Sequence, residues 1–163
     1  MDKELYKKEL WTSIDKAAVN LYYLDHFRDR QAMIEPLYRG ALGLTATLAV
    51  IISFFDVAFL IKIVSVITAL LATLPLVFPV IPKSSDFDKM SQLRLATSKW
   101  LISLGDFWIS EWTEEKYKKF SRMKLEYAQT EYELSTLFGK NNEALNRKAH
   151  ADANRYLDRY FPS

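Results

Sequence analysis

The side chains that most often carry catalysis are few in this chain, and their spacing assembles no active site. It has no cysteine and only two histidines, His26 and His150, so thiolate zinc sites, iron–sulfur clusters and cysteine nucleophiles are excluded. Glu114 and Glu115 are adjacent, and adjacent helix positions do not face each other, so they make poor paired carboxylates for hydrolysis. Asp56 and the other acids lack metal-binding spacing. We therefore predict no enzymatic activity, no metal ion and no cofactor.

Charge is distributed very unevenly along the sequence. The 163 residues include 22 basic and 20 acidic side chains, a net charge of +2. Because nucleic-acid binding needs a dense basic face, no direct binding of nucleic acid is expected. Residues 41–82 contain only two charges, Asp56 and Lys62. The apolar run from Leu37 to Pro82 is long enough for two membrane-spanning helices of roughly 20 residues each.

This run predicts an all-α membrane protein with a transmembrane helical hairpin over residues 36–82. The two spans are expected at about 37–56 and 60–81, which places Asp56 and Lys62 near the turn, at the membrane interface. Basic residues flank the other ends of the spans more densely than the turn, so both termini are expected in the cytoplasm. The alternative is a hairpin buried inside a soluble protein.

Small residues recur every three or four positions along both expected spans, so each helix has a face that allows close backbone approach. These faces could close the hairpin on itself or contact another subunit. Pro75 lacks an N–H and leaves the Leu71 carbonyl without its usual partner, which predicts a kink or a broken helix and suits a pore wall or gate. The candidates for pore lining or helix packing are Gly40, Gly43, Ala46, Ser53, Ser65, Thr68, Ala72 and Pro75.

The segments on either side of the hairpin are expected to be helical and cytoplasmic. Residues 1–35 form an amphipathic helix, and Pro36 suits the first position of the next one. Residues 83–163 predict a long helix or two collinear ones with a charged break near 111–115, ended by Gly139, and a last helix from Asn141 to about Tyr160.

An aromatic stripe runs along the first part of residues 83–163. It could form a ligand cage or a stacking platform for nucleic acid, but its spacing is that of a helix seam and favours packing in a core or an interface. The candidates for an oligomer seam are Trp100, Leu104, Trp108 and Trp112.

The layout resembles the SLATT superfamily, the two-transmembrane effector domains associated with SMODS nucleotidyltransferases and SLOG sensors in bacterial anti-phage systems. The features shared are the amphipathic first helix, the tight hairpin, and the long helix that begins at Phe87 and carries Trp100 and Trp112. The resemblance covers nearly the whole chain and brings no catalytic residue with it.

The resemblance implies an effector of anti-phage defence that forms homo-oligomers in the bacterial inner membrane. Such an effector makes a pore or disrupts the lipid bilayer, and the depolarisation that follows arrests growth. A separate sensor or signal-producing protein would activate it. The main alternative is a non-conducting anchor or assembly scaffold for a cytoplasmic partner. A membrane-bound hydrolase is a third alternative, and it is disfavoured because the sequence shows no nucleophile with a base beside it.

Overall fold

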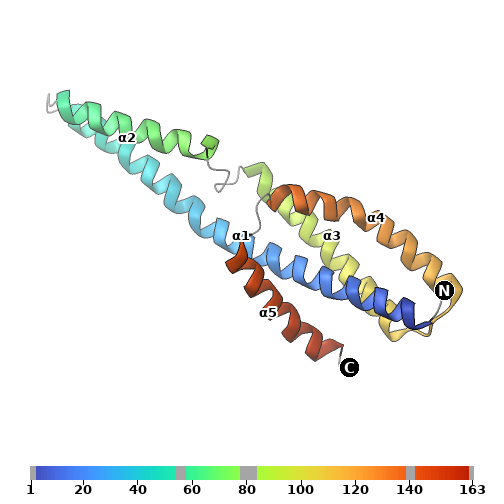
Figure 1. Cartoon of the computed structure of the whole chain (residues 1–163). Helices are drawn as coiled ribbons and strands as arrows, with labels where there is room; N and C mark the ends of the chain where they lie inside the picture. Colours follow the sequence, from blue (N-terminus) through green and yellow to red (C-terminus); the bar gives the residue numbers. More distant parts are fainter. Residues whose placement is uncertain (1–2, 54–57, 78–83, 139–141, 162–163) are drawn as a thin grey trace. The chain divides into compact units, whose positions relative to one another are not determined.

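The computed structural model describes residues 3–53, 58–77, 84–138 and 142–161, and this part of the chain contains helices and no strand. The all-α class is therefore confirmed. Figure 1 shows the five helices in chain order. They are α1 (Lys3–Ser53), α2 (Ala58–Val77), α3 (Ser84–Ile109), α4 (Glu114–Phe138) and α5 (Glu143–Tyr160).

The chain divides into two compact units. The first, here called the bundle, consists of Met1–Phe27 and Asp88–Ser163. The second, the hairpin unit, consists of Arg28–Phe87. The expected domain boundaries, at residues 35 and 82, both lie inside the hairpin unit. The turns of α1 that directly follow Phe27 belong to this unit and not to the bundle.

The prediction that the protein crosses the bacterial inner membrane twice, with both termini in the cytoplasm, is wrong. Within residues 3–53, 58–77, 84–138 and 142–161, no helix combines the length and the apolar character that a membrane crossing requires. The first expected span is not a separate helix but the end of the 51-residue α1, whose beginning is rich in charge. The second, α2, includes the charged Lys62.

Helix α1 continues through Pro36, where the sequence suggested a new helix. Proline removes the donor that would pair with the carbonyl four residues earlier, that of Ala32. Ala32 and Pro36 are both exposed, so solvent can take the place of the missing donor. The amphipathic segment and the first apolar segment therefore form a single helix.

Helices α3 and α4 pack side by side and antiparallel, which corrects the prediction of one long helix or two collinear ones. Trp100 stacks on Tyr127 with ring centroids 5.4 Å apart, and Phe107 meets Phe120 edge to face at 5.9 Å. The chain turns at residues 110–113. There the Thr113 hydroxyl accepts a hydrogen bond from the backbone N–H of Lys116 (3.2 Å) and caps the start of α4.

The N-cap of helix α5 is Asn142, one residue after the expected Asn141, and the helix itself begins at Glu143. The Asn142 side chain accepts hydrogen bonds from the backbone N–H groups of Ala144 (3.1 Å) and Leu145 (3.2 Å). These are donors that the start of a helix leaves without partners. Gly139 and Asn141, the expected end and start signals, lie outside the described residues.

The first half of α1 is the central helix of the bundle, because the main core cluster joins its side chains to those of α3, α4 and α5. Ion pairs tie the same helices together at the surface. Arg94 of α3 pairs with Asp25, and His26 lies 2.8 Å from Asp152 of α5. Two further pairs join α1 to α4, Lys16 with Glu131 (2.8 Å) and Lys124 with Glu9.

Buried phenols in the bundle predict a loss of stability at alkaline pH. Burial raises the pKa of Tyr127 above its usual 10.0, although its hydrogen bond with Thr97 acts in the opposite direction. Burial raises the pKa of three further tyrosines, Tyr6, Tyr22 and Tyr156. The folded state therefore holds these protons to a higher pH than the unfolded chain does.

The free energy of unfolding should not change through these tyrosines below pH 10, and should fall as the pH rises above that value. Each contributes up to about 1.4 kcal/mol per pH unit in the interval between its unfolded and folded pKa. Urea unfolding followed by circular dichroism between pH 8 and 11.5 measures this slope. Tyr127→Phe should make it shallower, and an identical slope would contradict the assignment.

Candidate functional site

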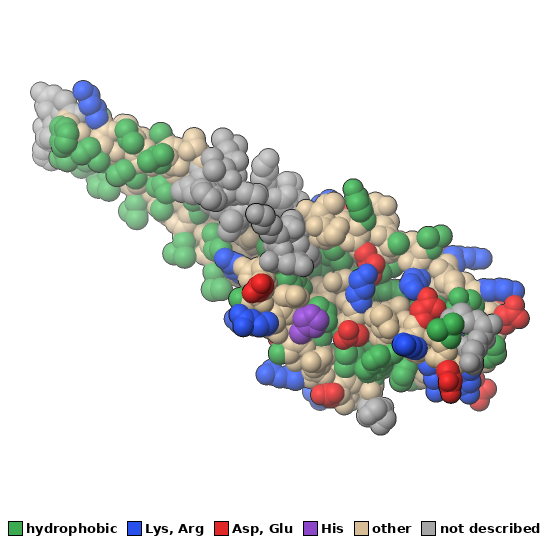
Figure 2. All heavy atoms as spheres, viewed as in Figure 1, with side chains coloured by type: hydrophobic (Ala, Val, Ile, Leu, Met, Phe, Trp, Pro, Cys, Tyr) green, Lys and Arg blue, Asp and Glu red, His purple; other side chains and the backbone are tan. Residues whose placement is uncertain are grey.

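The hairpin unit exposes most of its large apolar side chains. Within residues 32–52 and 59–73, no side chain is classed as buried. Figure 2 shows hydrophobic side chains spread over the visible described surface of α1 and α2 in this unit, whereas charges gather on the bundle. The large apolar side chains exposed on α1 and α2 here are Met33, Leu37, Leu44, Leu48, Val50, Ile51, Phe59, Leu60, Ile63, Val66, Ile67 and Leu70. We call these twelve residues the apolar face.

A shallow groove of about 340 Å³ lies between α1 and α2, and small side chains from both helices line it. Four of the predicted packing residues meet here with two of their small neighbours. The lining residues are Ala46, Ala49, Ser65, Thr68, Ala69 and Ala72. Small side chains of the two helices thus face each other here, and they leave a concave surface instead of a filled core.

The two glycines of the predicted small face take no part in this contact. At Gly40 and at Gly43, no atom lies within 4 Å of the position that a Cβ would occupy. Both glycines therefore face open space and are available to an approaching backbone.

The remaining predicted positions of the hairpin have different outcomes. Lys62 is exposed, and the helix continues past Pro75 to Val77 without the break that was expected. The side chains of Ser53 and Pro75, and the whole of Asp56, lie outside the described residues.

A hydrogen bond joins the two helices of the hairpin at the position that proline disturbs. The Tyr38 hydroxyl donates to the Leu71 carbonyl over 2.9 Å. Leu71 is four residues before Pro75, so its carbonyl is the one that the missing proline N–H leaves without a helical partner. Tyr38 replaces that partner from the other helix, and the sequence pattern had given no indication of its role.

The four members of the predicted oligomer seam have two different environments in the bundle. Trp100 is 6% exposed and Leu104 is fully buried, so packing within the chain already uses both side chains. Trp108 and Trp112 are only partly buried and pack at the edge of the same core. The helix-seam spacing reflects contact between helices of one chain at Trp100 and Leu104, and leaves two tryptophans at the surface.

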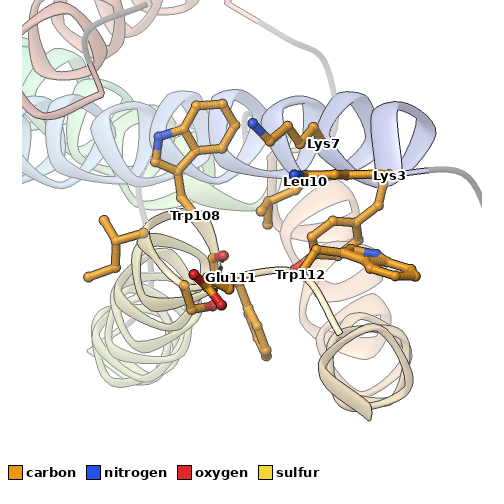
Figure 3. A pocket seen from close by; sticks show the side chains of 10 residues that line it. Lys3, Lys7, Leu10, Trp108, Glu111 and Trp112 are labelled. Carbon is orange, nitrogen blue, oxygen red and sulfur yellow. Dashed lines mark hydrogen bonds between the residues drawn. The ribbon is translucent and has the colours of Figure 1, made fainter. Parts of the chain in front are cut away.

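Trp108 and Trp112 line a cleft of about 330 Å³ between the start of α1 and the turn after α3. Figure 3 shows Trp108 and Trp112 on either side of Glu111, with Lys3, Lys7 and Leu10 contributed by α1. We call this the lysine–tryptophan cleft. The Trp112 indole nitrogen is buried and has no hydrogen-bond acceptor among the described residues. Within the same residues, neither lysine forms an ion pair.

Several titratable side chains elsewhere in the bundle join helices through ion pairs. In the described part of the chain, no group of three or more acidic or histidine side chains could hold a metal ion. His26 contacts Asp152, which also accepts a hydrogen bond from Arg155 at 3.2 Å. His150 is exposed on α5.

The apolar face and the lysine–tryptophan cleft are the two features that core packing leaves unexplained. The first suits the association of apolar surfaces, and the second combines positive charge with aromatic walls. Comparison with protein-family models, characterised proteins and solved structures finds no match to this chain.

Proposed function

We propose that this protein is a self-assembling effector whose apolar face associates with the same face of other copies of the chain. The observation that supports this most is the exposure of twelve large apolar side chains on one two-helix unit. Exposed apolar patches beyond a few hundred Å² are rare on monomers and usually mark an interaction surface. A hairpin of two helices has no third layer to cover its outer faces, so another molecule must do so.

The charge of the apolar face favours a second copy of the chain as the partner. Among the described residues from 41 to 73, Lys62 is the only charged side chain. Two such surfaces can therefore approach without placing rows of like charges opposite each other. The groove lined by Ala46, Ala49 and Thr68 offers a recess for the large side chains of the other copy, in the manner of knobs in holes.

The energy available is sufficient for a specific complex. Fully burying one large aliphatic side chain contributes about 1.5–3 kcal/mol, and association costs about 4–15 kcal/mol. Contact through several of the twelve side chains therefore outweighs the cost of association. The exposed Gly40 and Gly43 would let two backbones approach closely at one end of the contact.

The resemblance to the SLATT superfamily suggests a biological setting for this assembly. In that setting the protein is an effector of bacterial anti-phage defence, and a separate sensor or signal-producing protein controls its assembly. The pore and the depolarisation that the resemblance also implies depended on the two spans of the inner membrane, so we do not carry them forward. A scaffold that assembles a separate partner is the second candidate, and the same exposed surface supports it.

Sedimentation velocity on the full chain, in buffer without detergent, tests the proposal. The wild type is expected to sediment as an oligomer. Leu44→Glu combined with Val66→Glu, at positions 68% and 58% exposed, should weaken association roughly tenfold or more, because it places buried charge in the contact.

Leu125→Glu combined with Ile102→Glu is the matched control. These side chains are 77% and 64% exposed on the bundle, so the pair adds the same charge outside the apolar face and should leave association unchanged. A wild-type chain that stays monomeric at high concentration contradicts the proposal. Binding to lipid vesicles by monomers alone would contradict it as well, because the occupant of the face would then be lipid.

A further inference from the structure

We infer that the lysine–tryptophan cleft binds a small organic anion with an aromatic body. The inference does not depend on the proposed self-assembly, because the cleft belongs to the bundle and the apolar face to the hairpin unit. It follows from three properties of the cleft: its charge, an unused hydrogen-bond donor, and the aromatic rings that line it.

The charged side chains of the cleft leave it positive. Lys3 and Lys7 line the cleft and, being four residues apart on α1, lie on the same side of the helix. Among the described residues that line the cleft, Glu111 is the only one with a carboxylate. The first turn of α1 adds the positive end of the helix dipole. An anion is therefore favoured over a cation or a neutral molecule.

The buried donor of the cleft is the Trp112 indole N–H. Its nitrogen is buried and has no acceptor within the described part of the chain. A buried donor left without a partner costs about 1–3 kcal/mol. An oxygen of a bound carboxylate or similar group that reached this N–H would satisfy it, once the side chains that cover the nitrogen moved aside.

The walls of the cleft specify the rest of the ligand. Trp108 and Trp112, which are only partly buried, present aromatic surface to the cleft, whereas Phe107 and Leu10 are buried and contribute little. Aromatic rings prefer offset or edge-to-face contact with other rings, which adds to the gain from burying their area. The volume of about 330 Å³ lies at the lower end of the range for small-molecule sites. One or two fused rings with one acidic group fit this description.

Titration of the full chain with 2-naphthoate tests the inference, with the neutral 2-naphthamide and inorganic phosphate as comparison ligands. The chain contains four tryptophans, so incorporation of 5-fluorotryptophan gives four fluorine signals, which single tryptophan-to-phenylalanine variants assign. Naphthoate should shift the signals of Trp108 and Trp112 in a saturable way and move that of the buried Trp100 much less. The amide and phosphate should each bind at least tenfold more weakly.

Lys3→Gln combined with Lys7→Gln should weaken the binding of naphthoate at least tenfold without changing the circular dichroism spectrum. Lys118→Gln combined with Lys148→Gln removes the same charge from exposed positions on α4 and α5 and should leave binding unchanged. Equal binding of naphthoate and its amide would overturn the inference, because charge would not be recognised. If phosphate bound as tightly as naphthoate, the inference that the ligand has an aromatic body would be wrong. If the Lys3/Lys7 variant kept full affinity, the assignment of the site to the lysine–tryptophan cleft would be wrong.

Discussion

Replacement of Phe120 by alanine is expected to lower the free energy of unfolding of the bundle by about 3–5 kcal/mol. Phe120 is fully buried and meets rings from two other helices. It contacts Tyr6 edge to face at 5.7 Å and Phe107 at 5.9 Å, and it stacks on Trp100 at 6.1 Å. Alanine leaves a cavity bounded by large rings that cannot collapse into it without leaving their preferred rotamers.

Urea unfolding followed by tryptophan fluorescence measures this loss, since Trp100 reports directly on the site. Tyr132→Ala is the matched control, because it removes an aromatic ring from the same helix at a position 66% exposed. The control should change stability by less than about 0.5 kcal/mol. A loss below about 1 kcal/mol for the Phe120 variant would show that this cluster is not the centre of the core.

The second large effect is expected at the hydrogen bond between Tyr38 and Leu71. Tyr38→Phe keeps the ring and removes the hydroxyl, so the Leu71 carbonyl loses the donor that replaces the proline N–H. The carbonyl is partly buried, and an unsatisfied buried acceptor costs about 1–3 kcal/mol. Amide hydrogen exchange along α2 should show a matching decrease in the free energy of local opening.

Replacing Pro75 as well separates this explanation from a general weakening of the hairpin. Pro75→Ala restores an N–H four residues after Leu71, which can donate to the same carbonyl within the helix. In that background Tyr38→Phe should cost little, so the two substitutions should not be additive. If Tyr38→Phe costs as much in the Pro75→Ala background as in the wild type, the tyrosine does not compensate for the proline.

The approximate positions of the helical segments could be predicted from hydrophobic periodicity, because amphipathic helices repeat their apolar residues in a recognisable way. Their number could not, since α1 continues through Pro36, where two helices were expected. The direction of the chain at residues 110–113 could not. The aromatic stripe around Trp100 continues in phase around Tyr127, so a straight helix and a reversed one have the same pattern. The Thr113 hydroxyl that caps α4 is the residue that could have indicated the turn.

Hydropathy alone did not predict the structure of the apolar segment correctly. A low charge density over residues 41–82 suggested two membrane spans, yet within the described residues no helix meets the requirement for one. Counting charges does not reveal that the first apolar segment continues the polar beginning of α1 without a break. The small residues of the hairpin groove could be predicted because their spacing is local.

Two features of the candidate sites depend on contacts distant in sequence, and periodicity carries no information about them. The loss of the helical partner of Leu71 could be predicted from Pro75, but its replacement comes from Tyr38 on the other helix. The lysine–tryptophan cleft brings Lys3 and Lys7 to Trp112 only because α1 packs against the turn after α3. The tryptophans could be recognised as a stripe, but nothing in the sequence around Lys3 and Lys7 connects these lysines with it.

The two ion pairs between α1 and α4 favour one direction of α4 relative to α1. On α1 the acid Glu9 precedes the base Lys16, and on α4 the base Lys124 precedes the acid Glu131. With the helices parallel, each residue meets an opposite charge. If α4 were reversed, Glu9 would face Glu131 and Lys16 would face Lys124. Each exposed pair adds little stability, but the reversed arrangement would meet two repulsions in place of two attractions. The order of the charges therefore favours the parallel arrangement of α1 and α4 over the antiparallel one.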